Sequence, residues 1–149
     1  MAKQIDKKAF LTQTWFVFIF SLAIYAVIVG VVKHIPLSIK PYLEMFGNIA
    51  SIPFTVKILF GLALLEFFSL ITGEKTINTI YGNKDVFPKY MIIWAISESI
   101  AVYGLIASFL GNSGIYFPPF LILSLIAFFV WRPGKLKNVS DGNQPYSFE

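Results

Sequence analysis

The stretch that decides the fold is Trp94-Ala-Ile-Ser-Glu98-Ser-Ile-Ala-Val-Tyr103-Gly-Leu-Ile-Ala-Ser108, an apolar segment with one acid near its middle. Between Tyr90 and Trp131 the chain carries no other charged residue. A carboxyl group in hydrocarbon has to be protonated, paired or bound to a cation, because burying a bare anion there is very costly. An ionisable residue within a membrane span is therefore a candidate functional site.

The composition places the whole chain in a membrane. Of its 149 residues, 56% are hydrophobic and 13% are charged, and the mean hydropathy is +0.71. These values are too apolar for an ordinary soluble domain. The chain is long enough for about four helical spans of roughly 20 residues each. Its apolar runs are continuous rather than alternating, which disfavours a membrane barrel.

Four apolar runs predict an all-α bundle of four transmembrane helices, at about 9–32, 52–72, 90–110 and 115–131. The first run is longer than the apolar part of a signal peptide, so we expect a retained span. Together the runs define one membrane domain, residues 9–132, between a polar N-terminal segment (1–8) and a polar tail (133–149) that we expect to be flexible.

The connections between the runs differ in character. The first holds Tyr42-Leu-Glu-Met-Phe46, which fits either a short helix lying in the interface or a plain loop with aromatic anchors. Residues 73–89 are polar and predict a connection outside the bilayer. The turn Gly111-Asn-Ser-Gly114 is short, so the third and fourth spans should be antiparallel neighbours.

The Lys and Arg residues predict the orientation. Nine of them lie in the N-terminal segment, the 73–89 connection and the tail, whereas three lie on the other side. This bias places both termini in the cytoplasm of a multi-pass protein of the cell (inner) membrane. The net charge of +4 then reflects orientation and contact with lipid headgroups, and we expect no nucleic-acid partner.

The intramembrane acids are the candidate site residues. We expect Glu98 to be protonated and neutral, so that it could load and release a proton, or hold Na⁺ together with further oxygen ligands. Ser99 and Tyr103 are four residues apart on one helix side and could supply hydroxyl groups. Glu66 is the second intramembrane acid. Alternatively, both acids are neutral and bind neighbouring helices through hydrogen bonds, as structural contacts.

A strip of small residues follows the same span, namely Ser97, Ala101, Gly104 and Ser108. Their spacing of four, three and four residues places them on one helix face. Small residues let two helices approach closely in a membrane, so this strip predicts a helix-packing face, either within the chain or between copies in an oligomer.

The segment Glu98-Ser99-Ile-Ala-Val-Tyr103-Gly104-Leu105 resembles the ion-carrying helix of the c subunit (proteolipid) of rotary ATP synthases. That helix combines a membrane-embedded Glu with an adjacent hydroxyl residue and a Tyr five positions further on. The resemblance implies an H⁺ or Na⁺ site formed by Glu98, Ser99 and Tyr103. The second span lacks the glycine repeat of the c subunit's first helix. As a whole, the chain resembles small four-helix membrane proteins of bacteria.

Two functions follow from these observations. The protein is expected to be either a non-enzymatic accessory or scaffold subunit of a larger membrane complex, or a c-subunit-like oligomeric protein that handles H⁺ or Na⁺ through Glu98. Catalytic motifs are not evident, so we expect no enzyme. The absence of Cys and the single His34 disfavour a transition-metal site, and we expect no cofactor.

Overall fold

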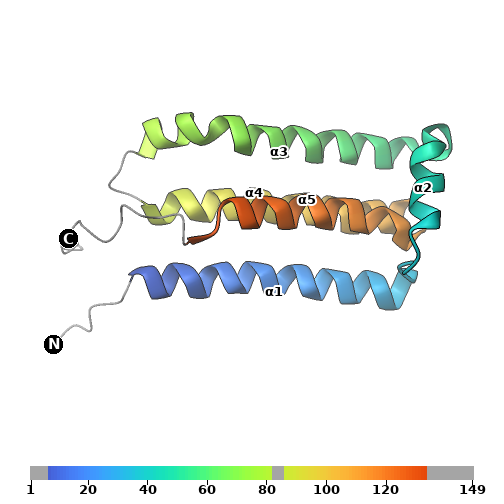
Figure 1. Ribbon diagram of the computed structural model, residues 1–149, viewed down its shortest axis with the longest axis horizontal. Helices are drawn as coiled ribbons and strands as arrows, with labels where there is room; N and C mark the ends of the chain where they lie inside the picture. The colour runs from blue at the N-terminus through green and yellow to red at the C-terminus, as the bar shows by residue number, and fades with distance from the viewer. Residues whose placement is uncertain (1–6, 82–85, 134–149) are drawn as a thin grey trace.

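The protein is a bundle of helices. The computed structural model describes residues 7–81 and 86–133, and every regular element in these two ranges is a helix (Figure 1). The elements are α1 (Lys7–Lys33), α2 (Lys40–Gly47), the short 3-10 turn η1 (Ile49–Ser51), α3 (Phe54–Tyr81), α4 (Val86–Leu110), the 3-10 turn η2 (Gly114–Tyr116) and α5 (Phe117–Val130).

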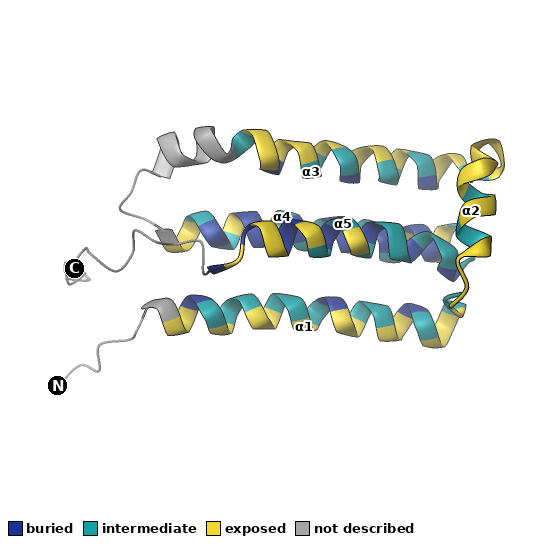
Figure 2. Ribbon diagram, viewed as in Figure 1, coloured by how far each residue is buried: buried dark blue, intermediate teal, exposed yellow. Residues whose placement is uncertain are grey.

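Four helices run along the bundle and one crosses its end. Successive long helices α1, α3, α4 and α5 alternate in direction, so the start of α1 and the end of α5 lie at the same end (Figure 1). The helix α2 lies across the opposite end (Figure 1). The central helix is α4, which packs against α1, α3 and α5. Figure 2 shows buried positions concentrated on α4 and exposed positions on the outer faces of α1 and α3.

Three of these helices are long and apolar enough to cross a membrane, at Ala9–Lys33, Phe54–Gly73 and Phe87–Leu110. Their outward side chains are large and apolar, including Phe16, Phe20 and Phe68, which suits a surface that faces lipid. The remaining apolar helix is shorter, because α5 has 14 residues and so spans only about 21 Å.

Two helices extend beyond the predicted spans. The second and third spans are predicted at 52–72 and 90–110, whereas α3 continues to Tyr81 and α4 begins at Val86. The apolar run ends where the hydrocarbon would end, whereas a helix stops only where a strong breaking signal occurs. Gly73 alone does not end α3, and the stronger turn signal Gly82-Asn83 directly follows its last residue. The predicted flexible tail lies almost entirely outside the described residues.

The strip of small residues lies in the core, against α5. Ser97, Ala101 and Ser108 are fully buried. A Cβ atom added at Gly104 would lie 2.6 Å from Phe120 Cβ on α5. Glycine is therefore what allows α4 and α5 to approach this closely.

The first connection contains a helix rather than a plain loop. Pro41 occupies the first turn of α2, where its missing N–H costs nothing. The Tyr42 hydroxyl donates a hydrogen bond to the Pro36 carbonyl oxygen over 2.8 Å, and burial raises the pKa of this tyrosine above its usual range. No residue of α2 is buried, and Leu43 and Phe46 are exposed.

Candidate functional site

The three candidate residues of α4 contact two different neighbouring helices. Ser99 and Tyr103 are four residues apart and share one face. Glu98 precedes Ser99 directly, so its side chain leaves the helix about 100° away from that face. Consequently the three residues do not converge on one point. Ser99 and Tyr103 contact α3, whereas Glu98 contacts α1.

Glu66 of α3 is the carboxyl group on which the two hydroxyl groups of α4 converge. Ser99 Oγ lies 2.6 Å from Glu66 Oε2, and Tyr103 Oη lies 2.6 Å from Glu66 Oε1. All three side chains are half-buried. Each carboxyl oxygen therefore has its own hydroxyl partner from the neighbouring helix, in a part of the bundle that is otherwise apolar.

The hydrogen-bond pattern around Ser99 bears on the state of Glu66. Ser99 Oγ also lies 2.7 Å from the carbonyl oxygen of Ile96. A serine hydroxyl has a single proton, so it cannot donate a full hydrogen bond to both oxygens. The pattern is complete when Glu66 carries a proton on Oε2: the acid donates to Ser99, Ser99 donates to Ile96, and Tyr103 donates to Glu66 Oε1.

Glu98 has a separate partner on α1. The Tyr25 hydroxyl donates a hydrogen bond to Glu98 Oε1 over 2.8 Å, and both side chains are half-buried. The two acids thus occupy different sides of α4, each held by a tyrosine from another helix: Tyr103 faces Glu66 and Tyr25 faces Glu98. Sequence reasoning missed Tyr25, although a tyrosine hydroxyl group within an apolar span signals a hydrogen-bond partner.

The packing face is used within the chain. Ser124 of α5 donates a hydrogen bond to the Ser97 carbonyl oxygen over 2.6 Å, and Ser124 is fully buried. Ser97 and Ser108 donate to carbonyl oxygens of their own helix, one turn earlier. Through this face, α4 binds α5, so a second copy of the chain could reach it only if α5 moved away.

The site is made of oxygen atoms. Among the residues that the structure describes, no three His, Cys, Asp or Glu side chains lie close enough together to hold a metal ion. The Glu66 site instead offers two carboxyl oxygens, two hydroxyl oxygens and the Ile96 carbonyl nearby. Such a set suits a proton or a hard cation such as Na⁺.

A comparison with known protein families shows a local similarity. Residues 69–111 match the family of the ATP synthase C subunit. Neither a curated protein nor a solved structure matches the chain significantly. The matched family is a non-catalytic membrane subunit, in line with the expectation that the chain is not an enzyme. The match starts near the end of the apolar part of α3 and includes all of α4. The local resemblance of the third span to the c-type proteolipid helix is thereby confirmed.

Proposed function

We propose that the protein binds H⁺ reversibly, or Na⁺ in its place, at a membrane-embedded site formed by Glu66, Ser99 and Tyr103. The observation that carries the proposal is the convergence of two hydroxyl groups of α4 on the two oxygens of one carboxyl group of α3. A structural contact between two helices would need only one such bond. The family match supports ion chemistry on α4, because it contains Glu98, Ser99 and Tyr103. Glu66 lies outside the match, one helical turn before its first residue.

This proposal changes which acid is central. The resemblance alone implied Glu98 as the ion carboxyl, with Ser99 and Tyr103 as its partners. Because these partners lie on Glu66, we assign the primary site to Glu66. Glu98, with Tyr25 as its single hydroxyl partner, is then a second carboxyl that can take up a proton on the other side of α4.

We further propose four spans with both termini in the cytoplasm of the cell (inner) membrane. The bias of nine basic residues against three supports this orientation. The alternating helix directions support it as well (Figure 1). In this arrangement α5 is a short fourth span, and α2 lies at the outer surface.

Labelling with a hydrophobic carbodiimide tests the ion site, because the reagent modifies protonated carboxyl groups reached from lipid. The protein in liposomes is labelled over a range of pH and of Na⁺ concentration, with K⁺ at equal ionic strength as the control. Peptide mass spectrometry then reports Glu66 and Glu98 separately. A proton site gives Glu66 labelling that falls as pH rises and ignores Na⁺. A Na⁺ site gives protection by Na⁺ but not by K⁺, and Ser99→Ala weakens that protection.

The second candidate function is an accessory or scaffold subunit of a larger membrane complex. The observation that favours it is the closed packing face: α5 covers the small residues that could otherwise build a ring of copies. In that case Glu66 and Glu98 are structural contacts between helices. Glu66 would then stay unlabelled at every pH, or react at a rate that neither pH nor Na⁺ changes.

A further inference from the structure

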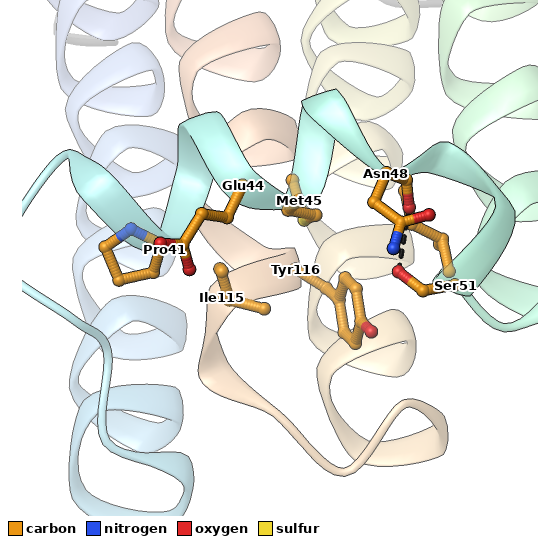
Figure 3. A pocket seen from close by; sticks show the side chains of 8 residues that line it. Pro41, Glu44, Met45, Asn48, Ser51, Ile115 and Tyr116 are labelled. Atoms are coloured by element: carbon orange, nitrogen blue, oxygen red, sulfur yellow. Dashed lines mark hydrogen bonds between the residues drawn. The ribbon is translucent and has the colours of Figure 1, made fainter.

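Two hollows lie side by side beneath α2, at the end of the bundle away from the start of α1. The first, of about 320 Å³, has walls of mixed polarity, and its polar residues include Glu44, Asn48 and Ser51 (Figure 3). The second, of about 300 Å³, lies between α2, α3 and α5. The two hollows share the side chains of Met45, Ile52 and Tyr116 as walls.

The second hollow has apolar walls and one cation. Phe46 and Ile49 line it from the α2 side, Phe60 from α3 and Phe120 from α5. Phe46 and Ile49 are 49% and 59% exposed, so the hollow reaches the surface of the bundle there. Lys57 of α3 is the charged residue in its lining.

Lys57 is half-buried beside this apolar space. Its Nζ atom makes a long hydrogen bond of 3.4 Å to the Ala50 carbonyl oxygen. Among the residues whose side chains are described, Lys57 has no carboxylate partner, and the ion pair found there joins Lys40 and Glu44. A lysine at the edge of an apolar region keeps its stem in the apolar part and its ammonium group at headgroup level.

We propose that this apolar hollow binds one acyl chain of an anionic phospholipid, whose phosphate group pairs with Lys57. The volume corresponds to about ten groups the size of a water molecule, which fits part of an acyl chain. The phosphate complements the unpaired ammonium group. The phosphate does not enter the neighbouring hollow, because the Glu44 carboxylate lines that space and would repel it. The exposed apolar residues of α2, such as Leu43, hold this helix at the level of the headgroups.

Native mass spectrometry of the full chain tests the proposal. The delipidated protein in mild detergent is titrated with phosphatidylglycerol or, at equal chain length, with phosphatidylcholine. We expect one phosphatidylglycerol to bind saturably before further lipids add. Lys57→Gln should weaken this binding about fivefold, toward the level of phosphatidylcholine. Lys40→Gln is the matched control, since Lys40 lies at the same end of the bundle but outside the lining, and it should leave the affinity unchanged.

A second pair of variants tests the hollow itself. Met45→Trp places a larger side chain in the wall of the hollow and should abolish saturable binding of both lipids. Leu43→Trp adds the same side chain at an exposed position of α2 outside the lining, and saturable binding should remain. Far-UV circular dichroism verifies that each variant is folded. Equal losses in Lys57→Gln and Lys40→Gln, or unchanged binding in Met45→Trp, would overturn the proposal and indicate ordinary surrounding lipid.

Discussion

Replacing Glu66 tests whether its carboxyl group is protonated in the folded protein. Glu66→Gln keeps the shape of the side chain. Its amide group can donate to Ser99 Oγ, and its carbonyl oxygen can accept from Tyr103 Oη, which is the pattern of a protonated acid. Glu66→Leu keeps the approximate size and removes both bonds, which measure 2.6 Å each.

The two variants should differ clearly in stability. Hydrogen bonds between membrane helices contribute about 0.6 kcal/mol on average and up to about 1.7, so Glu66→Leu should lose about 1–3 kcal/mol of unfolding free energy. Glu66→Gln should stay within about 0.5 kcal/mol of the wild type, because both bonds are kept. The assay is reversible unfolding in mixed detergent micelles, followed by far-UV circular dichroism.

One result would refute the reasoning. If the folded protein holds Glu66 as a carboxylate that accepts from both hydroxyl groups, the amide of Glu66→Gln opposes a hydroxyl donor and loses that bond. Glu66→Gln would then lose one of the two bonds, and its stability would fall about halfway between those of the wild type and Glu66→Leu. The double variants with Tyr103→Phe separate the two bonds, because Tyr103→Phe should cost nothing further in the Leu background.

Three further predictions concern helix packing, and the same unfolding assay measures each. Gly104→Ala should destabilise the protein by about 1–3 kcal/mol, since the new Cβ would lie 2.6 Å from Phe120 Cβ. The control Gly30→Ala, with nothing within 4 Å of its new Cβ, should be neutral or stabilise the protein by up to about 1 kcal/mol. Equal effects of the two variants would contradict the close approach of α4 and α5 at Gly104. Tyr25→Phe should cost about 0.6 kcal/mol and leave Glu66 labelling by carbodiimide unchanged, whereas altered Glu66 labelling would mean that the two acids are coupled. Ser124→Ala should cost about 0.6–1.7 kcal/mol, and no loss would argue against the bond between α5 and α4.

The long helices could be predicted from sequence because their apolar runs are continuous. Their ends could not be, since α3 extends past the apolar run to Tyr81. The pairing of the acids could not be predicted either. Glu98 and Ser99 are adjacent in the sequence, but the helix turns their side chains about 100° apart. Which acid receives the hydroxyl groups then depends on which helices flank α4, and that is a property of the packed bundle.

The same limit applies to the strip of small residues. Its spacing predicted a close helix contact, and Gly104 makes one. Spacing alone does not tell whether the partner helix belongs to the same chain or to another copy. The short turn before α5 favoured antiparallel neighbours, and the contact of Gly104 with Phe120 connects these two observations.

The indole groups of the chain give it a built-in optical probe. Trp15 donates to the Phe128 carbonyl oxygen over 3.3 Å, and Trp94 donates to the Trp131 carbonyl oxygen over 3.1 Å. All three tryptophans of the sequence therefore lie around the last turn of α5. Trp94 and Trp131 are buried and Trp15 is half-buried, so an aqueous quencher should dim their emission weakly while the bundle is folded and strongly once this end of it opens. The native fluorescence can thus report the packing of α5 against its neighbours, without an engineered label.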